Sequence, residues 1–244
     1  RTAFPRQRNE RKVPFMNAAS FEGPRFIDRV DAGRRLAPLI ASTLPGVGGA
    51  SDTLILGIPR GGVVVAATVA SCLGLPLGVV VVRKLGAPGH EEFALGAIAE
   101  GIRVIDAATI RTLRINDAAI DAVEATERQE LARRQARFAA AAQWNAKERD
   151  IVIVDDGIAT GATARAACEA VRAHGPRHLV LATPVAPASW HPPEGLVDGY
   201  LCLMPIADFW AVGQWYDDFT QTSDAEVERL LAPPTPAPGN IAPA

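Results

Sequence analysis

Two adjacent carboxylates, Asp155 and Asp156, stand between an apolar run and a loop that could bind an anion. The run, residues 151–154, contains only β-branched residues, which is typical of a strand buried on both faces of a parallel sheet. A glycine- and threonine-containing loop at 157–163 then leads into an alanine-rich helix. A helix start offers unpaired N–H groups and the positive end of the helix dipole. Residues 157–163 therefore predict a cradle for a phosphate-sized anion.

Neither common nucleotide-binding loop fits this segment. Residues 150–163 contain no lysine, which excludes a P-loop, and too few glycines for a dinucleotide fingerprint. An oxidoreductase that binds a dinucleotide is excluded on the same ground. Carboxylates repel phosphate but accept hydrogen bonds from hydroxyls. The ligand that satisfies both features is a sugar phosphate, with its diol on Asp155 and Asp156 and its phosphate on residues 159–163.

The same segment resembles the PRPP-binding motif of type I phosphoribosyltransferases, which runs from a hydrophobic strand through two acids to Ala-Thr-Gly-x-Thr. The resemblance implies an α/β fold with a central, mostly parallel sheet, helices on both faces, a small hood subdomain and a flexible loop. It also implies Mg²⁺ bound together with PRPP, in contact with Asp155 and Asp156 at most through water. The phosphate-binding residues that it assigns are Ala159, Thr160, Gly161, Ala162 and Thr163.

Composition excludes several other classes of protein. The chain is 48% hydrophobic and 21% charged, which is ordinary for a globular protein. Its formal net charge of −2 gives no electrostatic reason to expect a nucleic-acid or membrane partner. Three dispersed cysteines form no Cys-x-x-Cys pair, so neither a disulfide framework nor a zinc site is predicted. We expect a cytoplasmic protein, with a homodimer as one candidate assembly.

A second corner of strand, loop and helix is predicted earlier in the chain. Residues 53–58 are typical of a buried strand and residues 63–73 of a helix, with Pro-Arg-Gly-Gly between them. A guanidinium suits phosphate oxygens, and the resemblance makes this the pyrophosphate loop; a solvated loop arginine is the alternative. Relatives carry a cis peptide here, and a preceding proline bond reaches cis for about 0.5–1 kcal/mol. We therefore predict a cis Ile58–Pro59 bond. The residues assigned to this loop are Pro59, Arg60 and Gly61.

Arg83 and Lys84 precede a segment rich in glycine and proline. This segment resembles the flexible loop of adenine-type phosphoribosyltransferases, which closes over PRPP and excludes water. We expect residues 83–92 to form a mobile, irregular loop whose two cations neutralise the leaving pyrophosphate; a charged surface loop is the alternative. The following apolar stretches predict a hairpin around Glu100, which the resemblance places near the acceptor base as a proton-handling group. An ordinary turn acid is equally consistent with that position.

Residues 209–217 form an aromatic-rich segment that resembles the base-binding hood of hypoxanthine–guanine enzymes. In that resemblance Trp210 stacks on the base and Asp217 is the acid, while hydrophobic packing of the hood is the alternative. Two features depart from those enzymes. Ala159 stands where they place an aspartate base, and residues 181–184 offer no base-reading lysine. The acceptor therefore stays open, with a purine-like base favoured. The whole pattern is most similar to bacterial phosphoribosyltransferases without an assigned acceptor.

The chain is predicted to form one transferase domain at 24–231, with its hood mainly at 186–222. A polar arm at 1–23 and a disordered tail rich in proline and alanine at 232–244 would flank it. The implied function is Mg-dependent transfer of the 5-phosphoribosyl group from PRPP to a nitrogenous base, with release of pyrophosphate, as in nucleotide salvage. The alternative is a PRPP- or nucleotide-sensing protein without turnover. The candidate catalytic residues are Arg60, Arg83, Lys84 and Glu100.

Overall fold

The computed structural model describes residues 25–43 and 52–232. The predicted N-terminal arm and nearly all of the predicted C-terminal tail lie outside these ranges. The elements of the described chain are α1 Arg29–Thr43, β1 Thr53–Gly57, α2 Gly61–Leu73, β2 Leu77–Val79, β3 Arg83–Ala87, β4 His90–Ala99, β5 Ile102–Ile105, α3 Ala107–Leu113, α4 Asp117–Arg137, α5 Ala139–Ala142, β6 Asp150–Val154, α6 Ala162–Arg172, β7 His178–Pro187, β8 Gly199–Ile206, the 3₁₀ turn η1 Val212–Trp215, and α7 Asp224–Leu231.

Five parallel strands form the main sheet, in the order β2-β1-β6-β7-β8. The predicted α/β class with a central parallel sheet is therefore confirmed. β1 and β6 lie side by side in register, from Thr53 opposite Asp150 to Gly57 opposite Val154. The two strands consequently end at the same level, at the carboxyl edge where open α/β sheets bind ligands. This register brings the two predicted anion-binding corners next to each other.

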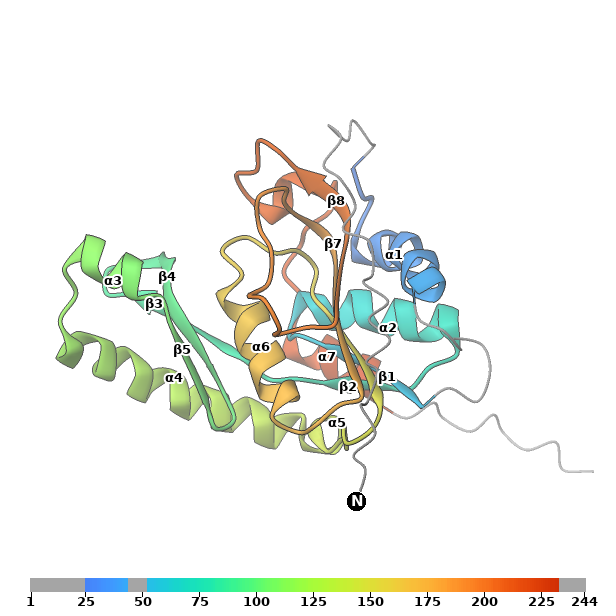
Figure 1. The fold of residues 1–244 in the computed structure, drawn as a ribbon, viewed down its shortest axis with the longest axis horizontal. Helices are drawn as coiled ribbons and strands as arrows, with labels where there is room; N and C mark the ends of the chain where they lie inside the picture. Colours follow the sequence, from blue (N-terminus) through green and yellow to red (C-terminus); the bar gives the residue numbers. More distant parts are fainter. Residues whose placement is uncertain (1–24, 44–51, 233–244) are drawn as a thin grey trace, which may run out of the picture.

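Helices cover both faces of the main sheet (Figure 1). Ile151 and Ile153 of β6 pack on the side of α6, whereas Val152 and Val154 pack on the side of α1 and α2. Successive side chains of a strand point to opposite faces, so a strand covered on both sides must be apolar at every position. This requirement explains the unbroken β-branched run at 151–154.

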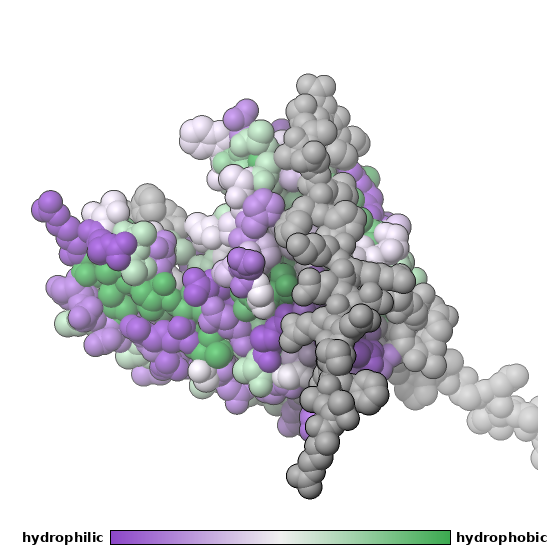
Figure 2. Space-filling view, in the orientation of Figure 1, coloured by the Kyte–Doolittle hydropathy of each residue, from purple (hydrophilic) through white to green (hydrophobic). Residues whose placement is uncertain are grey.

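A second, antiparallel sheet of β3, β4 and β5 extends to one side of the main sheet, together with α3 and α4 (Figure 1). We call this unit the β3–β5 arm. Its residues Leu85, Leu95 and Ile98 pack with Ile120 and Leu131 of α4, in a buried cluster that continues to Val63 of α2, Val79 of β2 and Val227 of α7. The space-filling view shows a band of apolar surface across the arm, flanked by polar residues (Figure 2). The arm is thus a packed unit rather than a loop.

The expectation that residues 83–92 form an irregular loop is wrong. β3 and β4 pair as an antiparallel hairpin from Arg83 opposite Ile98 to Ala87 opposite His90. The register shifts on both sides of Gly86, and Pro88 falls in the turn between the strands. Glycine is well tolerated at a bulge and proline in a turn, so neither residue interrupts the pairing. The predicted hairpin around Glu100, by contrast, is confirmed by β4 and β5.

Two local features fix the ends of helices. The amide of Asp31 donates to the Asp28 carboxylate over 2.7 Å, so Asp28 caps the N-terminus of α1. α4 ends at Phe138, whose side chain is buried, and the short helix α5 follows it. Among the helices of the described ranges, none is long and apolar enough to cross a membrane.

Gly96 of β4 generates a first testable prediction. A Cβ built on Gly96 would lie 2.0 Å from the carbonyl oxygen of Val104 on the neighbouring strand β5. We predict that Gly96→Ala separates β4 from β5 and lowers the free energy of unfolding by at least the roughly 1–3 kcal/mol typical of overpacking. Hydrogen exchange should show faster exchange at the amides of β4 and β5.

Gly175→Ala is the matched control, because a Cβ there would meet no atom within 4 Å and only the positive φ of 69° opposes it. It should lower stability by about 1–2 kcal/mol without selective exchange in the arm. Unchanged exchange at β4 and β5 in Gly96→Ala would contradict the proposed close approach.

Candidate functional site

The acid pair, Asp155 and Asp156, begins the loop that leaves the carboxyl end of β6. The main chain anchors this loop to β7, through hydrogen bonds from the amide of Asp155 to Ala182 O (3.2 Å) and from the amide of Ile158 to Val185 O (2.9 Å). The amide of Asp156 donates to Asp155 Oδ1 over 2.9 Å. The two carboxylates are therefore held on a fixed backbone at the edge of the sheet.

The 59–62 loop packs directly against the acid pair. A Cβ on Gly61 would lie 1.9 Å from Asp156 Oδ2, and a Cβ on Gly62 would lie 2.9 Å from Asp155 Oδ1. Only glycine allows so close an approach of the two chain segments. The two corners that were predicted separately from the sequence thus form one site, and Arg60 lies between Pro59 and these glycines.

The 157–163 loop has the geometry of a helix-start cradle. Gly161 adopts a left-handed conformation with φ 78° at the N-terminus of α6. The indole of Trp190 lies over it and donates from Nε1 to Thr160 O over 3.2 Å. A Cβ on Gly161 would lie 2.1 Å from that nitrogen. The first turn of α6 presents backbone N–H groups at this end, as an anion site requires.

Arg29 of α1 completes the polar side of the acid pair. Its Nε lies 2.7 Å from Asp156 Oδ2, and its Nη1 donates to Thr220 O over 2.8 Å. The guanidinium also lies 3.9 Å above the ring of Phe219. Helix α1, whose Leu36, Ala37 and Ile40 pack in the core, therefore also contributes a cation to the candidate site.

Burial sets the electrostatics of the acid pair. It raises the pKa of Asp155 well above the ordinary aspartate value, and the neighbouring charge of Asp156 raises it further. Burial also raises the pKa of Asp156, while the Arg29 guanidinium acts in the opposite direction. The pair is thus a concentration of negative charge that a ligand with hydroxyl donors or a cation would stabilise.

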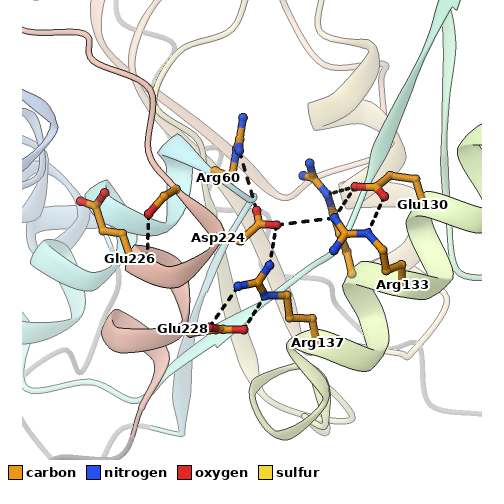
Figure 3. Close-up of polar contacts among 9 residues, drawn as sticks. Arg60, Glu130, Arg133, Arg137, Asp224, Glu226 and Glu228 are labelled. Carbon is orange, nitrogen blue, oxygen red and sulfur yellow. Dashed lines mark hydrogen bonds and ion pairs between the residues drawn. The ribbon is translucent and has the colours of Figure 1, made fainter.

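Arg60 is held in a network of ion pairs (Figure 3). Its Nη1 lies 3.8 Å from Asp224 Oδ1 at the start of α7. The other oxygen of Asp224 lies 3.0 Å from Arg137 and 3.5 Å from Arg133, both on α4. These two arginines pair in turn with Glu228 and Glu130. Asp224 thus links the 59–62 loop to α4 and α7 and restrains the position of Arg60.

The segment after β8, residues 207–222, lies against the acid pair. A Cβ on Gly157 would lie 2.2 Å from Val212 Cγ1, so η1 packs onto the 157–163 loop. The Tyr216 hydroxyl donates to Asp156 O over 2.6 Å. Trp210, two residues before η1, is 84% exposed. Asp217 is exposed as well, and its amide donates to Phe26 O over 2.8 Å. Hydrophobic packing of the hood, the alternative for this segment, is confirmed for its other apolar residues but not for Trp210; the residues that pack are Phe209, Val212, Trp215, Tyr216 and Phe219.

The structure does not bring all predicted residues to this site. Glu100 lies at the β4–β5 turn, where Gln135 donates to it over 3.2 Å. It lines a separate cleft of about 290 Å³ with Ala170 and His174, at the end of α6 opposite to the 157–163 loop. Arg83 is paired with Glu127 of α4 at 2.6 Å, and Lys84 is an exposed residue of β3. Within the arm, β3 packs against α4, and Arg83 therefore lies beside that helix rather than at the acid pair.

The prediction of a cis Ile58–Pro59 bond is wrong. The cis peptide of this loop lies one bond later, between Pro59 and Arg60. The prediction combined a cis peptide implied by the resemblance with the low intrinsic cost of a cis bond before proline. The structure has the cis peptide in this loop, but at the bond before Arg60.

Four residues of the site were missed by sequence reasoning: Arg29, Trp190, Tyr216 and Asp224. Each reaches the site from an element distant in the sequence; Arg29 and Asp156, for example, are 127 positions apart. For an arginine in an amphipathic helix or an aromatic residue in a loop, the neighbouring sequence does not indicate which distant residue the side chain contacts. Only Trp190 and Tyr216 had a general cue, since they fall in the predicted hood and its aromatic segment.

Comparison with known proteins agrees with this geometry. The model of the phosphoribosyl transferase domain family matches residues 28–219. Two curated relatives, both named "Putative phosphoribosyl transferase" and from two strains of Mycobacterium tuberculosis, are 49% identical over 212 residues. The match covers 84% of this chain but 46% of the relatives, so the chain spans less than half of their length. The crystal structure of TT1426 from Thermus thermophilus is 41% identical, with a TM-score of 0.65; the match covers 85% of this chain and 97% of that one.

Burial of the acid pair predicts that the charge of Asp155, which would serve ligand binding, lowers the stability of the folded protein. Its raised pKa means that the folded state retains the proton to a higher pH than the unfolded state does. The stability linked to this group is complete below the ordinary value of 3.8 and is lost as the pH rises through the raised pKa. Asp155→Asn removes the charge and keeps an oxygen for the amide of Asp156.

We predict that Asp155→Asn raises the free energy of unfolding at pH 7, because the neutral amide removes the cost of burying a carboxylate beside Asp156. The gain should shrink toward pH 4. Thermal unfolding between pH 4 and pH 8 measures it, with Asp121→Asn on the exposed side of α4 as the control. A gain independent of pH, or a loss of stability at neutral pH, would contradict the electrostatic account.

Proposed function

Because the chain belongs to the phosphoribosyl transferase domain family, we propose that it transfers the 5-phosphoribosyl group of PRPP to a nitrogenous base and releases pyrophosphate. The observation that carries this proposal is the close approach of Gly61 to Asp156, with a Cβ position only 1.9 Å from Asp156 Oδ2. It joins an arginine-containing anion loop to a pair of hydroxyl acceptors and a helix-start phosphate cradle. PRPP carries the three groups that these parts would bind.

Each part of PRPP would have its own partners. The ribose hydroxyls would donate to Asp155 and Asp156, and the 5-phosphate would bind the N–H groups and hydroxyls of the loop residues Ala159, Thr160, Gly161, Ala162 and Thr163. The pyrophosphate would lie along Pro59, Arg60 and Gly61. Preorganised positive charge stabilises a leaving group best when it is already in place, and the ion pair with Asp224 restrains Arg60 in that way.

Magnesium fits this site as part of the substrate. Among residues 25–43 and 52–232, no group of three or more His, Cys, Asp or Glu side chains could hold a metal ion by itself. The oxygen ligands of the ion would come from PRPP and from water molecules, as Mg²⁺ commonly accepts, and Asp155 and Asp156 would contact the ion through those waters. The ion would neutralise charge that develops on the pyrophosphate.

The acceptor would bind beside the segment after β8. Trp210 offers an exposed indole for stacking, and Asp217 an exposed carboxylate. We favour a purine-like base because aromatic stacking suits a large flat heterocycle. Proton transfer from the acceptor is not assigned to Glu100, which lies at the far end of α6. A cytoplasmic location and a homodimer remain predictions.

A second candidate function is a PRPP-sensing protein without turnover. It is favoured by Ala159, which stands where related enzymes place an aspartate base, and by the remote position of Glu100. Pyrophosphate release from Mg-PRPP, assayed over a panel of purine and pyrimidine bases, separates the two functions. Turnover with any base supports the transferase, and PRPP binding without release supports the sensor.

The acid pair supplies the next testable prediction. Asp156→Asn should weaken PRPP binding more than tenfold, because a hydrogen bond to a charged acceptor is worth roughly 1.5–3 kcal/mol. Isothermal titration calorimetry with Mg-PRPP measures this, and circular dichroism verifies the fold. Asp150→Asn, at the opposite end of β6, should retain the wild-type affinity. Equal affinity of wild type and folded Asp156→Asn would refute the assignment.

Trp210 supplies a separate prediction about the acceptor. Trp210→Ala should reduce turnover by weakening the binding of the acceptor base, by roughly 1–3 kcal/mol of stacking, while PRPP affinity stays within twofold. The KM for the base should therefore rise by about fivefold or more. Leu113→Ala, another exposed apolar residue but in α3, is the control. A Trp210→Ala protein with an unchanged KM for every productive base would exclude stacking.

A further inference from the structure

Arg29 connects three parts of the molecule at the acid pair. It belongs to α1, lies 2.7 Å from Asp156 Oδ2, donates to Thr220 O over 2.8 Å and stacks 3.9 Å above Phe219. Its side chain is only 11% exposed. Surface ion pairs contribute little because solvent screens them, but a pair this sheltered is screened far less. The contact is therefore strong enough to control its partner.

The direction of the contact distinguishes the two oxygens of Asp156. Oδ2 faces Arg29 and the 59–62 loop, where a Cβ on Gly61 would lie 1.9 Å from Oδ2 and 2.6 Å from Arg29 Nε. No ligand atom could enter between Oδ2, Gly61 and the guanidinium. The carboxylate can therefore receive a sugar hydroxyl at Oδ1, and Arg29 determines that orientation.

We propose that Arg29 is a positioning residue of the PRPP site, which fixes the Asp156 carboxylate toward the sugar and ties it to the segment after β8. The proposal rests on the proposed function, since it assumes that Asp156 binds the ribose. The guanidinium makes a carboxylate contact, a carbonyl contact and a ring contact at once. A lysine ammonium lacks the planar fork needed to combine them.

Arg29 also offsets the cost of burying the Asp156 carboxylate, because its charge and its hydrogen bond both lower the pKa that burial raises. The charged side chains that face this carboxylate are Arg29 from α1 and Asp155 on the same loop, and the Tyr216 hydroxyl donates to the main-chain oxygen of Asp156. Asp31 of α1 lies near Tyr216, and Asp218 lies near Arg29. Without Arg29, burial disfavours ionisation of Asp156 more strongly. Affinity for PRPP should then be lost at a higher pH than in the wild type.

The test compares Arg29→Gln, Arg29→Lys and Arg35→Gln by calorimetric titration with Mg-PRPP between pH 5 and pH 8. Arg35 is a matched control on the same helix, because it pairs with Asp31 at 3.7 Å and stacks 4.5 Å from Phe26. We expect at least a tenfold loss of PRPP affinity in Arg29→Gln at pH 7 and a steeper loss toward pH 5. Arg29→Lys should restore the pH profile but only part of the affinity. Arg35→Gln should bind as the wild type does.

Thermal unfolding of Arg29→Gln, Asp156→Asn and the double variant separates the inference from the function on which it rests. If the effects of the two substitutions on the free energy of unfolding are strongly coupled, the Arg29–Asp156 contact is retained. If the wild type nevertheless binds no PRPP, the proposed function is refuted. PRPP binding by the wild type and equal binding, at every pH, by a folded Arg29→Gln would overturn the positioning role. Equal losses of affinity in Arg29→Gln and Arg35→Gln would overturn it too, as a general effect of weakening α1.

Discussion

The contact between the 59–62 loop and the acid pair is the constraint on which the rest of the site depends. Gly61 and Gly62 allow the main chain after β1 to touch the carboxylates that follow β6. That contact exists because β1 and β6 are adjacent, parallel and in register to their last residues. Any side chain larger than hydrogen at either glycine would force the two anion-binding loops apart. A ligand that spans both loops depends on their remaining together.

Bringing two carboxylates into a sheltered corner has an electrostatic cost, and the surrounding structure offsets it. The amide of Asp156 and the guanidinium of Arg29 act directly on the pair. The cation of the adjacent loop, Arg60, is balanced by Asp224 and does not collapse onto the acids. The site consequently has separate positions for positive and negative charge, which a substrate with both hydroxyls and phosphates requires. Retaining such groups commonly sacrifices stability for function.

The β3–β5 arm is a folded unit and not the irregular loop that was predicted for residues 83–92. Its strands β3 and β4 pair as an antiparallel hairpin with a bulge at Gly86, its buried residues are apolar, and Arg83 pairs with α4. Family membership agrees with the proposed PRPP site at the acid pair and the 59–62 loop, while the arm, Trp210 and the position of Glu100 bear on the proposed acceptor.

Local features of this protein could be predicted from its sequence, because they depend on residues close together in the chain. Unbroken apolar runs indicate buried strands, and glycines between a strand and a helix indicate tight turns. The order of Asp155, Asp156 and Thr160 indicates an anion cradle. The sequence also predicted the hairpin turn at Glu100–Gly101. Contacts between side chains far apart in the chain, by contrast, are set by the tertiary structure. Arg29 joins Asp156, Asp224 joins Arg60, and Glu100 lies away from the site, because strand order, register and the packing of α4 and α6 set these distances. No periodicity within a segment encodes those long-range pairings.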